Sequence, residues 1–218
     1  NSEVGHVNLG AGRVVYQDLA KINMAITQNT LKDEAVLKDA FTYAKTNNKA
    51  VHLLGLVSDG GVHAHINHLE GLLKAAQAAG VPKSYVHAFT DGRDVDPKSG
   101  AGFLAGVQDI CTSTNAHLAS VIGRYFAMDR DQRWERVKKA YDLLVNGTGT
   151  KTENLAQAMQ ANYAAGTTDE FIEPIALPEN GNLEAGRIKA DDVVIFFNFR
   201  TDRGRQLTQA LSQMAFPP

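Results

Sequence analysis

Polar and charged side chains follow four short apolar runs of the sequence, each in a turn marked by glycine or asparagine. The turns read SDGGVHAH (58–65), DGRD (91–94), GRYFAMDR (123–130) and NFRTDR (198–203). Arginine, which occurs in three of the four turns, carries a planar fork of donors that matches carboxylate and phosphate oxygens two at a time. The turns therefore predict a site for a small phosphorylated acid. Their charged and imidazole residues are Asp59, His63, His65, Asp91, Arg93, Asp94, Arg124, Asp129, Arg130, Arg200, Asp202 and Arg203.

These turns meet only if the runs before them are neighbouring parallel strands. Ligands of open parallel sheets bind at the carboxyl ends of the strands, where such turns would lie together. Guanidinium groups in one crevice repel each other unless an anion lies between them, and Asp94, Asp129 and Asp202 would neutralise part of that charge. The alternative is a set of separate surface ion pairs, each worth ~0–1 kcal/mol. Repetition at four strand ends favours a crevice shared by Arg93, Arg124, Arg130, Arg200 and Arg203.

Helical and strand patterns alternate along the chain, as the crevice requires. Apolar runs predict strands over 51–57, 85–90, 117–123 and 192–199, and a strand-like run over 171–177 carries Pro174, which belongs at an edge or an irregular place. Helical periodicity or helix-boundary residues predict helices over 16–24, 31–47, 65–79, 102–111, 131–145 and 155–165, and another from about 202. The alternation predicts an α/β fold with a mainly parallel central sheet and helices on both faces.

The histidines of the first turn leave a choice between a metal site and an anion contact. His63, His65 and His68 have the spacing H-x-H-x-x-H, and histidine is the commonest metal ligand. No cysteine accompanies this spacing, which is not a strong metal signature. We therefore favour His63 as a hydrogen-bond donor to an anion. A metal site and a capping or packing role are the alternatives. The remaining histidines, His6, His52, His87 and His117, are expected to be structural.

Composition narrows the class of protein. The chain has 218 residues and a formal net charge of −2, which argues against a nonspecific binder of nucleic acid or membrane surfaces. No apolar run approaches the ~18 residues that span a bilayer. The single cysteine, Cys111, forms no internal disulfide and is expected to be buried, and a cytoplasmic location follows as the default. Neither G-x-G-x-x-G after the first strand nor G-x-x-x-x-G-K-[ST] supports nucleotide binding.

Five motifs together carry a resemblance to a known family. NSEVGHVNLGAGRVVYQ (1–17), SDGGVHAH, DGRD, GRYFAMDRDQRWERVKKAY (123–141) and NFRTDR occur in the order and spacing of the cofactor-independent, metal-dependent phosphoglycerate mutases. The resemblance extends from Ser2 to about Arg203, nearly the whole chain. Such enzymes have two domains: one resembles alkaline phosphatase and carries two manganese ions, and the other is an α/β domain that orients the glycerate part of the substrate.

The resemblance implies roles for individual residues. Ser2 matches the nucleophile, which takes the phosphoryl group from 3-phosphoglycerate and returns it to the 2-hydroxyl to give 2-phosphoglycerate. Ser2 would also contact metal in the intact protein. Asp94 would contact the glycerate hydroxyls and serve in proton transfer, as a second catalytic residue. The residues matching the substrate-binding positions are His63, Arg93, Asp94, Arg124, Arg130, Arg200 and Arg203.

The resemblance also implies a division of labour. Residues 1–15 would form the arm with the nucleophile loop and hinge, and residues 16–218 the substrate-binding domain. The family's other metal ligands find no match in this sequence, so both manganese ions would be held by the missing metal-binding domain, and none is expected in this chain. The chain alone is then expected to lack turnover. The alternatives are a non-catalytic phosphate- or carboxylate-binding α/β module and a metal-dependent phosphatase, which requires ligands that the sequence does not show.

Overall fold

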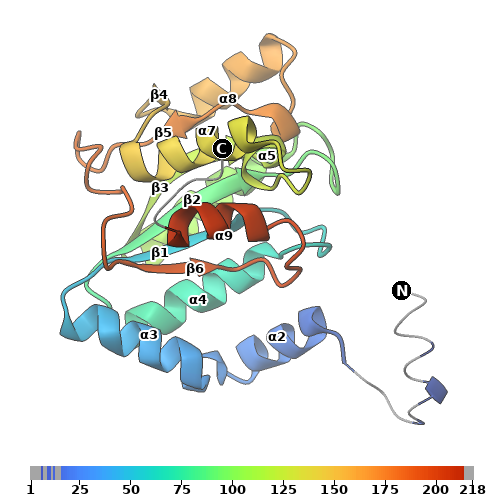
Figure 1. Ribbon diagram of the computed structural model, residues 1–218, viewed down its shortest axis with the longest axis vertical. Helices are drawn as coiled ribbons and strands as arrows, with labels where there is room; N and C mark the ends of the chain where they lie inside the picture. Colours follow the sequence, from blue (N-terminus) through green and yellow to red (C-terminus); the bar gives the residue numbers. More distant parts are fainter. Residues whose placement is uncertain (1–5, 7–8, 11, 13–15, 214–218) are drawn as a thin grey trace.

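The computed structural model describes residues 16–213 together with residues 6, 9, 10 and 12. A six-stranded sheet in the order β4-β5-β3-β2-β1-β6 forms the centre of the domain (Figure 1). Strands β6, β1, β2 and β3 are neighbours and parallel, as the shared crevice requires. The strands are β1 (Val51–Leu56), β2 (Ser84–Thr90), β3 (Ala116–Gly123), β4 (Thr150–Lys151), β5 (Ile175–Ala176) and β6 (Val193–Phe196).

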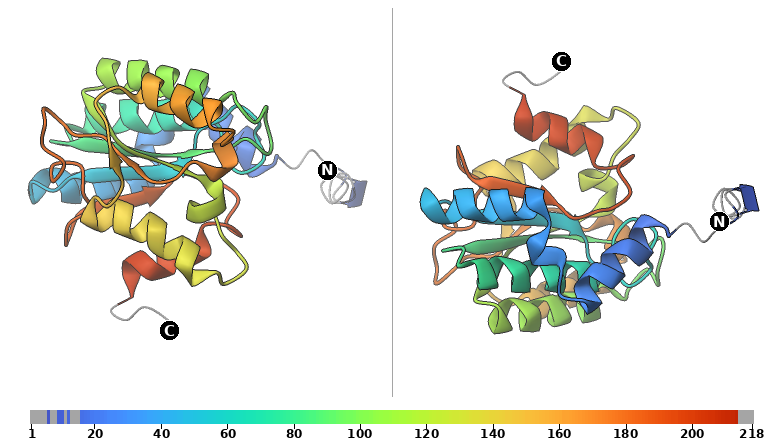
Figure 2. Two further views of the ribbon diagram at one scale, coloured as in Figure 1. Left: turned by 90° about the horizontal axis from the view of Figure 1, so that it is seen from above. Right: turned by 90° about the horizontal axis from the view of Figure 1, so that it is seen from below.

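Helices cover both faces of the sheet. Helices α4, α5 and α8 lie on one face, and α7 and α9 lie on the other (Figure 2). Because both faces are covered, every residue of β1 and β2 is buried, which explains their nearly continuous apolar sequences. The predicted α/β fold with a mainly parallel sheet is confirmed. The helices are α2 (Asp18–Thr27), α3 (Ala35–Thr46), α4 (Ile66–Ala79), α5 (Gly100–Ser113), α6 (Arg124–Ala127), α7 (Trp134–Tyr141), α8 (Leu155–Ala164) and α9 (Arg205–Ser212).

Two predicted helices are shorter than their periodicity suggests. The helix expected over 31–47 divides into a 3-10 turn, η1 (Leu31–Asp33), and α3, because Glu34 has extended backbone angles. The helix expected over 131–145 begins only at Trp134 and passes into a π-helical turn, η2 (Asp142–Asn146). In contrast, α4 ends at the predicted place, where Gly80 has a φ of 76°.

The predicted strand over 171–177 is largely wrong. Its first residue belongs to a 3-10 turn, η3 (Asp169–Phe171), and only Ile175 and Ala176 form β5. Strand β5 runs antiparallel to β3, an exception to the otherwise parallel pairing. Pro174 stands directly before β5, and its carbonyl accepts a hydrogen bond from the Thr150 amide. This short strand matters for the site, because η3 before it packs against the turns that follow β2 and β3.

Candidate anion-binding site

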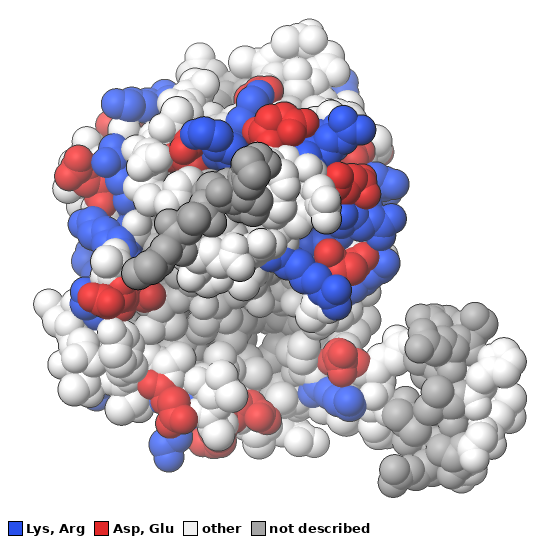
Figure 3. Space-filling model, in the orientation of Figure 1, with Lys and Arg blue, Asp and Glu red and all other residues white. Residues whose placement is uncertain are grey.

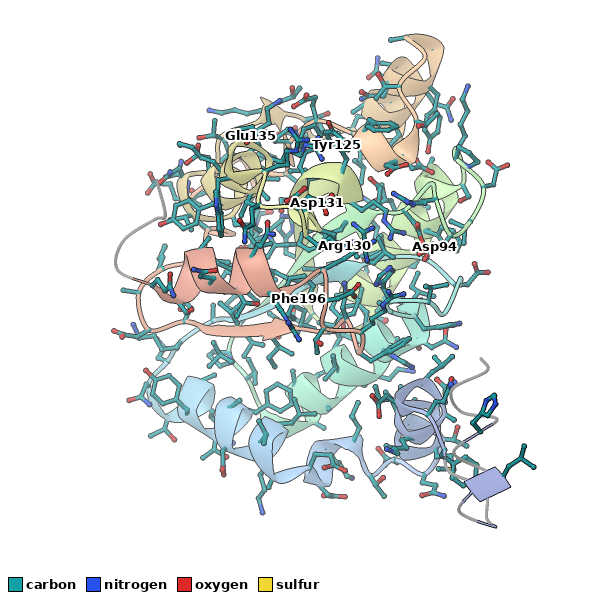
Figure 4. All side chains as sticks on the ribbon, turned by 45° about the vertical axis from the view of Figure 1, so that its right-hand side comes forward. Asp94, Tyr125, Arg130, Asp131, Glu135 and Phe196 are labelled. Atoms are coloured by element: carbon teal, nitrogen blue, oxygen red, sulfur yellow. The ribbon has the colours of Figure 1, made fainter. Side chains whose placement is uncertain are left out.

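The turns after β6, β1, β2 and β3 meet at the carboxyl edge of the sheet. The side chain of Asn198, after β6, accepts a hydrogen bond from the Leu56 amide at 3.0 Å and ties β6 to β1. The Arg200 amide donates to the carbonyl of His63 at 3.3 Å. Figure 4 shows Asp94 and Arg130, from two of these turns, on the same side of the domain. The topology thus gathers the residues that the sequence places at four separate strand ends.

Asp91 fixes the turn after β2. Its buried carboxylate accepts hydrogen bonds from the Ser58 hydroxyl at 2.6 Å and from the backbone amides of Arg93 and Asp94 at 3.2 and 3.0 Å. A fourth bond comes from Arg124 Nη1 at 2.6 Å. Burial alone raises the pKa of Asp91, but the hydrogen bonds from Asp94, Ser58 and Arg124 outweigh it and lower the pKa below its usual value. The carboxylate is therefore charged and saturated with donors.

Arg124 is buried between two carboxylates. Its Nη1 lies 2.6 Å from Asp91 Oδ1 and 2.6 Å from Asp94 Oδ2, and only 3% of its side chain is exposed. Burial lowers the pKa of Arg124, but the two carboxylates raise it above its usual value. Arg124 thus holds Asp94, the predicted proton-transfer residue, at a fixed place, and its Nη1 already has two anionic partners.

His63 lies between Asp94, the partner of Arg124, and Asp202, a second carboxylate at this edge of the sheet. Its Nε2 is 3.9 Å from Asp94 Oδ2 and its Nδ1 is 3.9 Å from Asp202 Oδ1, both beyond hydrogen-bond distance. Burial lowers the pKa of His63 to about 4; the charges of Arg124 and Arg200 lower it further, while Asp94 and Asp202 oppose them. The imidazole is therefore neutral at neutral pH and has one N–H to donate.

Asp202 joins two further arginines. Arg130 Nη1 and Arg200 Nη2 donate to Asp202 Oδ2 at 3.1 and 3.0 Å, and Arg200 Nε lies 3.0 Å from Oδ1. Burial raises the pKa of Asp202, but the charge and hydrogen bonds of Arg200 and the hydrogen bond of Arg130 lower it below its usual value. Arg130 and Arg200 remain about half exposed, unlike Arg124.

Arg203 completes the cluster and shows that its charges converge. Its Nη1 donates to the Met128 carbonyl at 3.1 Å. Burial and the positive charges of Arg130, Arg124 and Arg93, in that order, lower the pKa of Arg203. Arginines from the turns after β2 and β3 thus act on an arginine from the turn after β6, and a bound anion would relieve that repulsion. In Figure 3, Lys and Arg surfaces interleave with Asp and Glu surfaces along the right-hand side of the molecule.

Arg93 has a partner that sequence reasoning missed. Its Nη1 lies 3.5 Å from Glu170 Oε1, and 56% of the Arg93 side chain is exposed. Glu170 belongs to η3, which is anchored by the fully buried Asp169. Asp169 accepts hydrogen bonds from the Gly100 amide at 2.7 Å and the Tyr163 hydroxyl at 2.5 Å. No local sequence pattern predicts the Arg93–Glu170 and Gly100–Asp169 contacts, because they join positions 77 and 69 residues apart in sequence.

Asp129 does not neutralise the cluster as predicted. Its carboxylate accepts from the backbone amides of Asp131 and Arg133 at 2.9 and 3.0 Å and pairs with Arg136 at 3.4 Å. It therefore shapes the loop before α7. The guanidinium of Arg136 also stacks over the Tyr125 ring, 3.8 Å from its centroid.

The other histidines form structural contacts. His65 caps α4 by accepting from the Asn67 amide at 3.2 Å, and His68 pairs with Asn23 at 2.8 Å. His52 bonds to His87, and His87 bonds to Ser120, in a chain across three buried strands. His117 contacts the Leu177 carbonyl at 3.2 Å. Within residues 16–213 and the four described residues before them, no group of three His, Cys, Asp or Glu side chains could hold a metal ion.

Two further sequence expectations concern single residues. Cys111 is buried, as predicted, and burial raises the pKa of its thiol to about 12. Ser2, the predicted nucleophile, lies outside the described residues. None of the helices within the described part of the chain is both long and apolar enough to cross a membrane.

Fold and site define an α/β domain with a cluster of arginines at the carboxyl edge of its parallel strands. Comparison with known families then places it: the chain belongs to the family described as BPG-independent PGAM N-terminus, whose model matches residues 22–217. The resemblance found in the sequence is thereby confirmed.

Two bacterial relatives match nearly the whole chain. The chain is 62% identical over 216 residues to a 2,3-bisphosphoglycerate-independent phosphoglycerate mutase of Flavobacterium johnsoniae, covering 99% of this chain and 43% of the relative. It is 55% identical over 217 residues to the enzyme of that name from Parabacteroides distasonis, covering 100% and 43%. A crystal structure of Leishmania mexicana phosphoglycerate mutase superposes with a TM-score of 0.88 at 30% identity, covering 100% of this chain and 41% of that chain. The chain thus spans less than half the length of these relatives.

Proposed function

We propose that this chain is the substrate-binding part of a glycolytic phosphoglycerate mutase of the cytoplasm, an isomerase that interconverts 3-phosphoglycerate and 2-phosphoglycerate through a phosphoserine. The observation that carries the proposal is the convergence of five arginines on the carboxyl edge of four parallel strands. Phosphate and carboxylate groups are the ligands that such guanidinium forks bind best. Relatives named as phosphoglycerate mutases match nearly the whole chain, which supports the same substrates.

The geometry suggests a distinct task for each part of the cluster. Arg93, Arg130 and Arg200 keep half-exposed guanidinium groups and would bind the phosphate and carboxylate of the substrate, together with Arg203. His63 would form one hydrogen bond with the same ligand through its Nε2 atom. These contacts would orient the glycerate and stabilise its negative charge during phosphoryl transfer.

Asp94 would act on the glycerate hydroxyls. Arg124 fixes one oxygen of its carboxylate, and the Asp94 side chain remains partly exposed. A carboxylate held in this way can accept a proton from a hydroxyl and return it. Arg124 would serve mainly to hold Asp94, in addition to its predicted contact with substrate.

The remaining chemistry would come from outside the described residues. Ser2 would accept the phosphoryl group, with residues 1–15 as the arm that carries it and residues 16–218 as the substrate domain. Two manganese ions, held by a metal-binding domain of the parent protein, would activate the serine and neutralise the transferring group. The described residues offer no ligand set for these ions.

Calorimetric titration with 3-phosphoglycerate at low salt tests the proposal. We expect the 218-residue chain to bind and Arg93→Ala to lose roughly tenfold or more in affinity, because one charge-assisted contact is removed. Lys74→Ala removes the same charge from an exposed position on α4 and should bind like the wild type. Equal loss in both variants, or no binding by a folded chain, would contradict the proposed site.

The same preparation tests the division of labour. We expect no conversion of 3-phosphoglycerate to 2-phosphoglycerate by the 218-residue chain, since it spans 43% of the length of its relatives. Measurable conversion, followed by phosphorus NMR, would refute that part of the proposal.

A further inference from the structure

Asp202 occupies the same arginine donors that a ligand anion would need. Arg130 and Arg200 come from different turns, yet both donate to its Oδ2, at 3.1 and 3.0 Å. A carboxylate held by two guanidinium groups is the arrangement that a bound phosphate or carboxylate would itself adopt. Asp202 and an incoming anion therefore compete for one set of hydrogen bonds.

The two ion pairs of Asp202 are exchangeable, whereas those of Arg124 are not. The side chains of Arg130 and Arg200 are each 47% exposed and that of Asp202 is 34% exposed. Water and salt screen charges at such positions, so each pair is weak. Arg124 is 3% exposed and held by two carboxylates. One part of the cluster is thus built to stay in place, and the other can change partners at low cost.

His63 is close enough to Asp202 to become an alternative hydrogen-bond partner. Asp202 Oδ1 and His63 Nδ1 lie 3.9 Å apart, and both atoms are buried without a hydrogen-bond partner. Arg200 Nε is 3.0 Å from the same Oδ1 but lacks the alignment of a hydrogen bond. Buried polar atoms are normally paired, and these two face each other about 1 Å beyond bonding distance. A small rotation of the carboxylate would let His63 Nδ1–H donate to it.

We propose that the Asp202 carboxylate occupies the arginine cluster as an internal anion and pairs with Arg130 and Arg200 while no ligand is bound. When a phosphate-bearing ligand binds those two arginines, Asp202 pairs with His63 instead. The inference rests on the proposed anion binding at this site and assigns it a mechanism of exchange. Ligand binding then satisfies two buried atoms that are otherwise unpaired. The same carboxylate repels the ligand, which weakens its binding and favours its release.

This role predicts whether a substitution of Asp202 strengthens or weakens phosphate binding. Asp202→Asn keeps the size of the side chain and one acceptor oxygen for an arginine but removes the competing charge. Because the ion pairs that it loses are weak and screened, the relief of repulsion dominates. We expect inorganic phosphate to bind the variant roughly threefold to tenfold more tightly. If Asp202 merely shaped the site, the variant would bind phosphate more weakly.

Titration of the 218-residue chain and its variants with inorganic phosphate, followed by amide NMR shifts, measures the direction of the change in phosphate affinity. The control is Asp131→Asn, which removes the same charge from an exposed neighbour of Arg130. Tighter binding by Asp202→Asn alone supports the inference. Weaker or unchanged binding by Asp202→Asn overturns it and leaves the proposed function standing. Failure of the wild type and Asp131→Asn to bind phosphate at all overturns both.

A second measurement uses the wild-type chain, so it does not depend on whether an Asp202 variant folds. In wild-type chain labelled with nitrogen-15 at histidine, phosphate should shift the Nδ1 signal of His63 toward that of a hydrogen-bonded N–H. His63→Asn identifies the signal by its disappearance. A His63 Nδ1 signal that stays unchanged at saturating phosphate would overturn the transfer of Asp202 from the arginines to His63.

Discussion

Arg124 Nη1 donates to Asp94 Oδ2 at 2.6 Å, although the two residues stand 30 positions apart in turns that follow different strands. The same nitrogen bonds to Asp91, so a single buried guanidinium group joins two carboxylates. Repulsion would separate these carboxylates without it. The candidate proton-transfer group is therefore held by the turn after β3 as much as by its own turn.

Asp91→Asn should destabilise the fold and release Asp94. The amide cannot accept all four hydrogen bonds, and it leaves the buried Arg124 with one carboxylate fewer. Removing one partner of a buried ion pair costs about 3 kcal/mol. Urea denaturation measures the change in the free energy of unfolding. Asp131→Asn, at an exposed position, should stay within about 0.5 kcal/mol of wild type, and an equal loss in both variants would contradict the role of Asp91.

Gly123→Ala should loosen the contact between β3 and η3. A Cβ at this position would collide with the carbonyl of Glu170 and lie 2.7 Å from the Ile172 amide. Forcing a methyl group into packed backbone costs about 1–3 kcal/mol. Gly102→Ala is the control: a Cβ there meets nothing within 4 Å, and alanine favours the helix α5 by about 0.5–1 kcal/mol. Thermal unfolding should move in opposite directions for the two variants; parallel shifts would rule out this steric account.

Tyr163→Phe should weaken both the fold and ligand binding. The hydroxyl donates to buried Asp169 and accepts from the Ala101 amide at 3.1 Å, so its loss leaves buried polar groups unpaired. We expect a loss of about 1–3 kcal/mol in the free energy of unfolding. Since Asp169 anchors the segment that holds Glu170, the affinity for 3-phosphoglycerate should also fall. Tyr43→Phe, at an exposed position of α3, should change neither quantity. A Tyr163→Phe chain with wild-type stability would show that Asp169 does not need the hydroxyl.

Stability should fall as pH falls from about 6.5 to about 4, in part because of His52. Burial lowers the pKa of His52 to about 4, despite the opposing charge and hydrogen bond of Asp192 and with a smaller lowering effect of Lys189. The unfolded chain takes up a proton near pH 6.5 and the native state does not, so the unfolded state binds more protons in this window. The loss attributable to His52 is about 1–3 kcal/mol.

Urea denaturation across this pH range checks the prediction against His52→Gln. The variant cannot take up a proton at this position, so its stability should depend less steeply on pH than that of the wild type. Identical slopes for the two proteins would show that His52 does not contribute.

The strand-end chemistry could be predicted because each turn directly follows a short apolar run that forms a strand. Arg93, Arg124, Arg130, Arg200 and Arg203 needed only parallel neighbouring strands to meet. Which arginine each aspartate would pair with could not be predicted. Asp91 and Asp129 both follow strands, and only the path of each loop decides that Asp91 faces Arg124 and Asp129 faces Arg136.

Long-range contacts also escaped sequence reasoning. Glu170 reaches Arg93 from 77 positions away, and it lies directly before the strand-like run predicted over 171–177. The short antiparallel β5 that follows it has too few residues to show a period of its own.

The hydrogen-bonded chain from His52 through His87 to Ser120 has a consequence for how the strands find one another. Between β2 and β3 the register skips one residue, so that Val86 faces Leu118 while His87 faces Ser120. This irregularity brings His87 Nδ1 to 2.7 Å from the Ser120 hydroxyl. A one-residue slip would turn these groups to opposite faces and leave them buried and unpaired. Apolar strands of similar length could pair in several alignments, and this polar chain selects one of them during folding.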